Sequence, residues 1–314
     1  MESVTALSAD PICREHLAGR SHPERPERFD AVLDGLRKSG ALNRMVLLEP
    51  RTATQEELLL CHTPEYLLVA KHDVLAGFPT LSTGDTDITK NSWDVAARAA
   101  GGVLNAVDAV MAARARNAFC VVRPPGHHAS AGRGMGFCLF NNVALAARYA
   151  QERYGVGRVL IVDWDVHHGN GTQEIFYRDP SVFFFSTHQW PLYPGTGRAA
   201  ETGEGAGLGT TMNFPFPAGS GREEILGAVE TSLIPAADVF RPDLVLISAG
   251  FDSRFGDLLG RFILTDEDFA DLTRAVLEIA ARHAGARVVS VLEGGYSLDG
   301  LASAAAAHVA ALME

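Results

Sequence analysis

The chain has 314 residues, of which 47% are hydrophobic and 21% charged, a balance that is ordinary for a globular protein and excludes a disordered chain. Acidic residues outnumber basic ones 38 to 27, and the formal charge of −11 gives no electrostatic support for binding nucleic acid or an anionic membrane, while a cationic substrate would be attracted. No low-complexity linker divides the sequence, so we expect one domain over residues 1–314.

The amino-terminal segment and the cysteines bear on where the protein works. The first residues, MESVTALSADPICREH, lack the basic and long apolar regions of a secretory signal. No apolar run approaches the roughly 20 residues that cross a bilayer. The scattered cysteines form no Cys-x-x-Cys pair, which argues against a disulfide framework or a thiolate zinc site; they are Cys13, Cys61, Cys120 and Cys138. We therefore expect a cytoplasmic protein that does not enter membranes.

Short helices are expected in the first part of the chain. Residues 21–28, SHPERPER, are expected to form an ordered loop that enters a helix from Phe29 through Leu36. Thr54-Gln-Glu-Glu57 is a capping box, in which the first side chain and the last bond to each other's backbone amides. Thr63-Pro64 starts a further helix, with proline at its first position.

A polar loop and a long helix come next. Residues 76–91, AGFPTLSTGDTDITKN, form the first loop long enough to reach over a site. Asp85 and Asp87 are its candidates to meet a ligand, the alternative being ordinary turn and cap duties. An alanine-rich helix is predicted from Trp93 to Ala115, where the Gly101-Gly102 pair is tolerated only if close packing requires small residues.

Strands and helices alternate from about residue 118 to the end. This alternation predicts right-handed crossovers and a mainly parallel sheet, hence an α/β fold. The predicted strands are Ala118–Val122, a central strand from Val159, Val182–Ser186, Leu244–Ser248 and Val288–Leu292. The predicted helices are Val143–Tyr154, 222–239, 266–283 and a closing alanine-rich helix, and residues 195–209, with six glycines, are expected to form a surface loop.

Polar residues follow each predicted strand, and parallel strands bring such residues to one edge of a sheet. The central run VLIVDWDVHHGNG ends in acidic and imidazole groups, and residues two apart in an extended segment share a side. Buried carboxylates need a cation or dense hydrogen bonding. We choose Asp165, His167 and Asp252 as a metal set with one open position, the hydrolytic form of a zinc site, although oxygen-rich ligation also admits Fe²⁺. If the Asp-x-His pattern of Asp165 and His167 stood alone, the alternative to a metal site would be a strand end whose side chains are hydrogen-bonded.

Two adjacent histidines after Pro-Pro-Gly are unlike packing residues, because both rings need polar partners. Asp163 and Asn170 are the natural partners of His127 and His128. A carboxylate raises the pKa of an imidazole, whereas an amide leaves it nearer its free value. Two histidines supported differently can divide proton transfer and charge stabilisation between them.

Three aromatic residues complete the candidate site. Tyr296 follows two glycines and offers its hydroxyl to a developing oxyanion, the alternative being a turn with a packed tyrosine. Phe137 and Tyr193 lie in glycine- and proline-rich loops after strands. They either wall a narrow apolar slot or are ordinary packing residues.

The motifs RPPGHHA, GFCLFNN, DWDVHHGNGTQ, YPGTG, SAGFD and EGGY occur together and in this order. With them the chain resembles the zinc-dependent histone deacetylase and acetylpolyamine amidohydrolase family, especially its class II-like and bacterial members, over nearly its whole length. The resemblance implies a three-layer α/β/α fold of the arginase/deacetylase type, with the site at the carboxyl ends of the strands. It also implies one zinc ion and, as a second and structural ion, K⁺ bound near Asp163, Asp165, His167 and Ser186.

The resemblance assigns roles to the candidate residues. Asp165, His167 and Asp252 would bind zinc, and His128 would act as general base and then general acid. His127, supported by Asp163, would stabilise charge, and Tyr296 would bind the substrate carbonyl oxygen. Arg28 matches an arginine near an inner acetate-release channel. The implied substrate-binding residues are Asp85 at the rim, or else Asp87, with Gly136, Phe137, Tyr193 and Leu259.

The chain departs from the family pattern at three of these positions. Asn170 stands where many members have aspartate, and Tyr193 stands where phenylalanine is common, which should make the slot more polar. Leu259 occupies the position of an acidic gatekeeper in polyamine-selective relatives, which weakens the case for a polyamine substrate without excluding it.

The expected reaction is hydrolysis of an N-acetyl or other N-acyl amine, such as acetyl-lysine in a peptide or protein, or an acetylated small amine. One rival is acetylpolyamine hydrolysis. Another is a ureohydrolase with two manganese ions. The positive charge of Arg254, two residues after Asp252, argues against binding of the second ion. The last is a non-catalytic binding protein. The sequence leaves the substrate, the acyl chain and the oligomeric state open, a homo-oligomer included.

Overall fold

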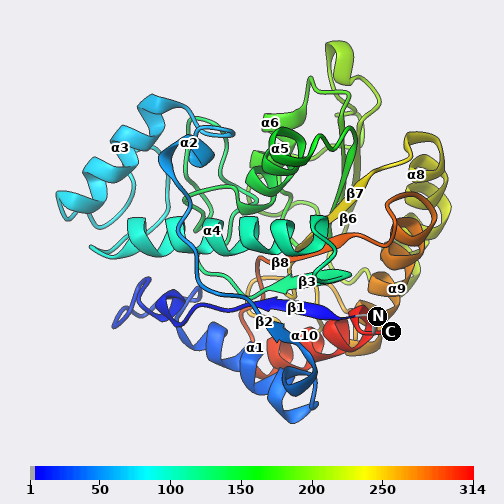
Figure 1. The fold of residues 1–314 in the computed structure, drawn as a ribbon, viewed down its shortest axis with the longest axis horizontal. Helices are drawn as coiled ribbons and strands as arrows, with labels where there is room; N and C mark the ends of the chain where they lie inside the picture. Colours follow the sequence, from blue (N-terminus) through cyan, green and yellow to red (C-terminus); the bar gives the residue numbers. More distant parts are fainter. Residues whose placement is uncertain (1–3) are drawn as a thin grey trace.

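A computed structural model describes residues 4–314. Residues 1–3 lie outside this part; they belong to the expected domain and to the amino-terminal segment that lacks the features of a secretory signal. Within residues 4–314 one eight-stranded sheet has the order β2-β1-β3-β8-β7-β4-β5-β6 (Figure 1). Every neighbouring pair is parallel. The strands are β1 (Thr5–Ser8), β2 (Val46–Leu47), β3 (Asn117–Cys120), β4 (Val159–Asp163), β5 (Val182–Gln189), β6 (Thr211–Phe216), β7 (Leu244–Ala249) and β8 (Val288–Leu292).

Helices cover both faces of this sheet, with α4 and α5 on one side and α1 and α10 on the other (Figure 1). The helices are α1 (Glu27–Lys38), α2 (Gln55–Leu58), α3 (Pro64–Leu75), α4 (Ser92–Met111), α5 (Asn142–Tyr154), α6 (Asn170–Phe176), α7 (Arg222–Ala228), α8 (Ile234–Phe240), α9 (Asp266–His283) and α10 (Leu298–Leu312). The capping box at Thr54 and the proline start of α3 are present as predicted.

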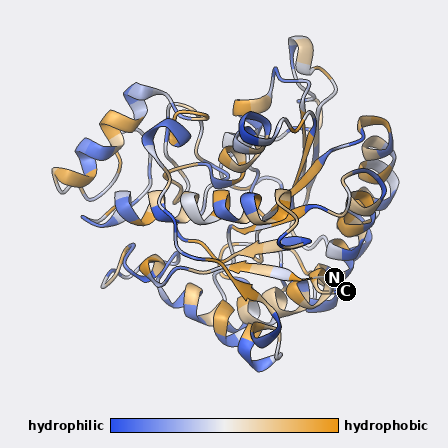
Figure 2. Cartoon of the chain, in the orientation of Figure 1, coloured by the Kyte–Doolittle hydropathy of each residue, from blue (hydrophilic) through white to orange (hydrophobic). Residues whose placement is uncertain are grey.

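The core has two halves because the strands are buried on both faces. Along β4, Val159 and Ile161 pack into one hydrophobic cluster with α4 and α5, while Leu160 and Val162 pack into the other with α1, α9 and α10. Figure 2 shows these strands as mainly hydrophobic in the middle of the molecule. Continuous apolar strands are typical of parallel sheets covered on both sides. The predicted three-layer α/β/α fold with a parallel sheet is therefore confirmed.

Several element boundaries differ from those predicted. Strands β1, β2 and β6 were not anticipated; β2 has only two residues, and β6 carries a proline, which edge strands tolerate. The predicted helix over 222–239 is interrupted by a π-helical turn at Val229–Leu233, just before Pro235, whose missing N–H breaks the helical pattern. The long helix ends at Met111 rather than Ala115, since the chain turns at Ala113 with φ +54°.

Both glycines of the Gly101-Gly102 pair pack closely against other segments, which is the condition under which the helix was expected to tolerate them. A Cβ atom at Gly101 would lie 2.2 Å from the carbonyl oxygen of Arg51, and one at Gly102 would lie 2.5 Å from the hydroxyl of Ser8.

Between Val4 and the carboxyl end of the chain, no helix has the length and apolar character needed to span a bilayer.

The SHPERPER loop contributes a buried ion network. Glu24 is fully buried and accepts hydrogen bonds from Arg28 (2.9 Å) and from Arg123 (2.5 and 2.7 Å). Burial opposes ionisation of this carboxyl, but the two guanidinium groups lower its pKa from 4.5 to about 2. Because the folded pKa lies below the unfolded one, Glu24 stabilises the fold fully above about pH 4.5, and this contribution is lost as pH falls towards 2.

Glu24→Gln should destabilise the protein by about 3–5 kcal/mol at pH 7, because it leaves two buried guanidinium groups without their counter-charge. Urea unfolding would measure the loss, with Glu27→Gln as a matched control. Glu27 is exposed in the same segment, so its substitution should stay within about 0.5 kcal/mol. A loss below about 1 kcal/mol for Glu24→Gln would contradict the importance of the network.

Candidate active site

The predicted site residues gather at the carboxyl ends of five strands that are separate in sequence. His127 and His128 follow β3, the Asp163–His167 run ends β4, Asp252 follows β7 and Tyr296 follows β8. Tyr193 follows β5, which is longer than predicted and includes His188. The sheet order places β3, β8, β7, β4 and β5 side by side, so that their carboxyl ends lie along one edge of the sheet.

Asp165, His167 and Asp252 form a tight, buried group of potential metal-binding side chains. Nδ1 of His167 lies 3.1 Å from Oδ1 of Asp165 and 3.2 Å from Oδ2 of Asp252. Among the residues that the structure describes, this is the only group of three or more such side chains with ligand atoms this close together. All three are less than 9% exposed, so their charges have little help from solvent.

The donor set fits a divalent cation. Zinc bonds of about 2.0–2.2 Å in tetrahedral geometry place neighbouring ligand atoms about 3.3–3.6 Å apart, close to the spacing found here. Burial and the charge of Asp165 raise the pKa of Asp252 to about 7, so the two carboxylates resist being ionised together without a cation. Their remaining oxygens accept backbone N–H groups, from Gly294 to Asp165 (2.7 Å) and from Val166 to Asp252 (2.9 Å).

Glycine is required at position 294 for this group to form. A Cβ atom there would lie 2.0 Å from Oδ2 of Asp252 and 2.6 Å from Oδ2 of Asp165. The Gly-Gly pair before Tyr296 therefore lets the backbone approach the carboxylates.

The two histidines have the partners expected for them. Nδ1 of His127 donates to Oδ2 of Asp163 at 2.9 Å, and Nδ1 of His128 donates to Oδ1 of Asn170 at 2.8 Å. Burial opposes protonation of His127, but Asp163 and other carboxylates raise its pKa well above 6.5. Burial and the neighbouring His127 and His167 lower the pKa of His128 well below 6.5.

This contrast divides the pair chemically. The raised pKa favours the cationic form of His127, whereas the lowered pKa favours a neutral His128 whose Nδ1 proton is engaged by an amide oxygen. The Nε2 atom of His128 then carries a lone pair and can accept a proton.

Glu293 belongs to the site although sequence reasoning did not assign it a role. Its carboxylate accepts the backbone N–H groups of Gly126 (2.7 Å) and His127 (3.1 Å), and the Ser248 hydroxyl (3.3 Å). Burial raises its pKa to about 7. It anchors the turn that carries both histidines, and its place in the EGGY motif was the available signal.

Tyr296 is nearly buried, and its ring lies against Arg28. The guanidinium carbon of Arg28 is 4.9 Å from the ring centroid, and the side chain of Phe137 packs edge-on at 6.0 Å. Burial raises the pKa of the Tyr296 hydroxyl well above 10, so it remains a hydrogen-bond donor at neutral pH.

A pocket of about 350 Å³ leads to these groups. Its lining contains all five predicted substrate-binding residues, and it also contains Leu192, which sequence reasoning missed. The lining residues are Asp85, His128, Gly136, Phe137, His167, Leu192, Tyr193, Leu259 and Tyr296. Mainly apolar walls with a few converging polar groups are typical of ligand pockets.

The rim of this pocket resolves the choice between Asp85 and Asp87. Asp85 accepts the N–H of Gly136 (2.8 Å) and the hydroxyl of Tyr193 (2.9 Å), so it joins the two loops that carry the aromatic walls. Asp87 instead bonds to Thr80 within its own loop. The Tyr193 hydroxyl, expected to make the slot more polar, is bound by the rim carboxylate.

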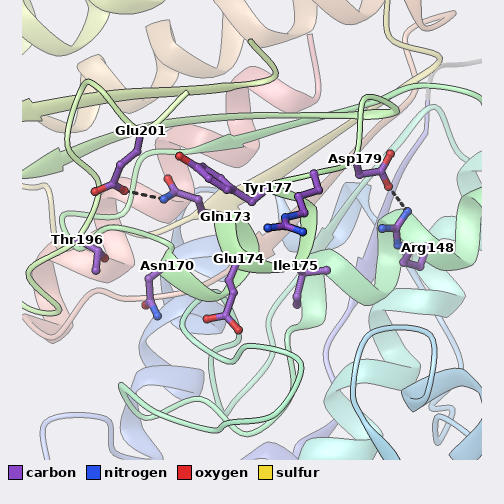
Figure 3. A pocket seen from close by; sticks show the side chains of 10 residues that line it. Arg148, Asn170, Gln173, Glu174, Ile175, Tyr177, Asp179, Thr196 and Glu201 are labelled. Atoms are coloured by element: carbon purple, nitrogen blue, oxygen red, sulfur yellow. Dashed lines mark hydrogen bonds and ion pairs between the residues drawn. The ribbon is translucent and has the colours of Figure 1, made fainter. Parts of the chain in front are cut away.

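A second, more open depression of about 720 Å³ lies around α6 (Figure 3). It shares no lining residue with the apolar pocket, although Asn170, the partner of His128, lines it. Several of its polar side chains are paired, with Arg148 bound to Asp179 and Gln173 bound to Glu201, as Figure 3 shows. These contacts are typical of a solvated surface.

Arg254 does not act as the sequence argument supposed. Its guanidinium pairs with Asp266 at 2.6 Å, so its charge is already neutralised at the start of α9. Within residues 4–314, the group of potential ligands whose atoms are all mutually close contains Asp165, His167 and Asp252 and no fourth residue.

The fold and the site together define an α/β protein with a buried acid–base centre at the base of a narrow apolar pocket. The chain belongs to the histone deacetylase family, whose domain model, the histone deacetylase domain, matches residues 22–312. Members of this family that resemble the chain indicate a hydrolase that acts on acetylated amides.

Two relatives and one solved structure show how close the likeness is. A probable deacetylase of Archaeoglobus fulgidus is 42% identical over 299 residues, which are 95% of this chain and 82% of that protein. The human protein named polyamine deacetylase HDAC10 is 43% identical across all of this chain, but the match covers 47% of its own length. The crystal structure of the HDA15 HD domain superimposes with a TM-score of 0.93 at 37% identity, covering 99% of this chain and 90% of that one.

Proposed function

We propose that the protein removes an acetyl group from an N-acetylated primary amine, such as acetyl-lysine in a peptide or protein, with one divalent metal ion. The observation that carries this proposal is that the Asp165, His167 and Asp252 group, His128 and Tyr296 converge at the base of one narrow pocket. A cation bound by the three side chains would supply Lewis acidity for the carbonyl group and for the attacking water.

The residues of the chain perform the remaining chemistry. Phe137 and Tyr193 hold the alkyl stem of the amine between two aromatic walls. His128 takes the proton of the attacking water through Nε2, and Tyr296 donates a hydrogen bond to the carbonyl oxygen as negative charge develops on it. His128 then gives its proton to the departing amine, while the cationic His127 offsets the added negative charge.

We further propose Zn²⁺ as the physiological ion, with Fe²⁺ as the alternative, and K⁺ as a structural ion near Asp163, which lies beside Ser186 in the register of β4 and β5. A cytoplasmic location and a single domain remain part of this proposal.

The test is a panel of acetyl-lysine peptides, acetylputrescine and longer acyl-lysines, assayed with chelator and with zinc restored. We expect the acetyl-lysine peptides to be hydrolysed, the activity to vanish with chelator, and zinc to restore it. Hydrolysis of acetylputrescine in preference to every peptide would favour acetylpolyamine hydrolysis. No hydrolysis of any substrate by the zinc-loaded protein would contradict the proposal.

A further inference from the structure

Asp257 touches two parts of the pocket and was not among the residues singled out from the sequence. It lies in the loop after Asp252, and its side chain is half-buried. Its Oδ2 atom accepts the backbone N–H groups of Tyr296 (2.7 Å) and Ser297 (3.0 Å). Its Oδ1 atom accepts the N–H of Leu259 (2.9 Å), a residue of the pocket wall. One carboxylate therefore binds the segment of Tyr296 to the loop that forms the rim.

The segment of Tyr296 needs such an external anchor. It follows two glycines, and Gly295 has φ +120°, a region that glycine reaches freely and other residues rarely adopt. Glycine gives the backbone close access to the carboxylates, but it does not by itself set the direction in which Tyr296 leaves the turn. The hydroxyl stands at the far end of the side chain, so a small rotation of the backbone moves it by a larger distance.

Two opposite charges hold this segment from two sides. Arg28 donates to the carbonyl oxygens of Gly295 (2.6 Å) and Glu293 (2.5 Å), while Asp257 accepts the amide groups that follow. Hydrogen bonds in which one partner is ionised are shorter and stronger than neutral ones. The backbone immediately before and at Tyr296 is therefore fixed by one cation and one anion.

We infer that Asp257 is a positioning residue that sets the place of the Tyr296 hydroxyl through its bonds to the backbone of Tyr296 and Ser297. This inference rests on the role proposed above for Tyr296 in binding the carbonyl oxygen. It goes further because Asp257 touches neither the substrate nor the cation site and acts only through the tyrosine.

The test combines Asp257→Ala with Tyr296→Phe in a double-mutant cycle. Displacing a catalytic group by about 1 Å costs up to about 100-fold, so Asp257→Ala should lower kcat by about 10- to 100-fold while KM changes less than about threefold. In the Tyr296→Phe background, the same substitution should lower the residual kcat by less than about threefold, because the group that it positions is already absent. Asp257→Asn retains one acceptor oxygen, so its kcat should lie between that of the unsubstituted protein and that of Asp257→Ala.

Two controls separate this role from a general loss of structure. Asp299→Ala removes an exposed carboxylate from the first turn of α10, close to the same segment, and should leave kcat and KM unchanged. Amide hydrogen exchange of the peptide covering 294–298 should accelerate in Asp257→Ala, while exchange in β4 and β7 stays slow.

An equal fold-loss of kcat in both backgrounds would overturn the inference, because it would mean that Asp257 does not act through Tyr296. Unchanged exchange of residues 294–298 in Asp257→Ala would overturn it as well. If the unsubstituted, zinc-loaded protein hydrolyses no acetylated amine, the proposed function fails. The exchange measurement then still decides whether Asp257 fixes the segment.

Discussion

Replacing His128 with alanine is expected to lower kcat for deacetylation by about 10²- to 10⁴-fold, the usual contribution of a general acid–base group. The reason is that His128 is held neutral by burial and has its Nδ1 proton engaged by Asn170, so that Nε2 is free to accept a proton. The variant should keep its metal, since His128 is not among the three grouped ligands. Steady-state rates on an acetyl-lysine peptide, measured with metal content, would check both statements.

A second substitution tests the same histidine through its pH dependence. Asn170→Asp places a carboxylate on Nδ1 of His128, which stabilises the protonated ring and raises its pKa. The unprotonated form needed for catalysis would then be lost at a higher pH, so the acidic limb of the pH–rate profile should move to higher pH.

A rate for His128→Ala within about threefold of the unsubstituted enzyme would show that another group takes the proton.

Tyr296→Phe is expected to lower kcat by about 10²- to 10³-fold, which is the typical cost of losing one oxyanion donor. The hydroxyl of Tyr296 is buried at the base of the pocket, where a hydrogen bond is less weakened by water than at the surface. The ring and its contact with Arg28 remain in the variant, so its folding and metal content should not change.

Tyr193→Phe is the matched control for this prediction. It also removes one tyrosine hydroxyl from the pocket, but that hydroxyl binds Asp85 at the rim instead of facing the reacting group. We expect kcat to change by less than about fivefold, as for a hydrogen bond that is partly exposed. If the two variants had similar rates, the assignment of Tyr296 as the oxyanion donor would be wrong.

The sequence predicts the middle of the sheet better than its edges. Strands β4, β7 and β8 have apolar runs followed by polar residues. Strand β4 begins at the predicted Val159, and the predicted bounds of β7 and β8 agree with the structure to within a residue. Strand β2 consists of two exposed residues, Val46 and Leu47, whose extended conformation comes from pairing with β1 and not from their own pattern. Tertiary pairing therefore created the elements that periodicity could not reveal.

The same distinction applies to the site. Residues with their own chemical signal, such as His128 and Asp252, could be chosen before the fold was known. Glu293 and Asp257 act by accepting backbone amides from distant segments. Apart from the EGGY motif that contains Glu293, nothing in the sequence marks either carboxylate for such contacts. The choice between Asp85 and Asp87 likewise depended on which one faces Tyr193 across the pocket.

Deacetylation by the proposed mechanism requires a single divalent cation held by Asp165, His167 and Asp252. Anomalous diffraction from crystals of the zinc-loaded protein, collected on both sides of the zinc edge, tests this directly. We predict one ion per chain about 2.0–2.2 Å from one atom of each of the three side chains, and none at this position in Asp252→Asn. No ion among these residues in the zinc-loaded protein, or two ions side by side, would contradict the account.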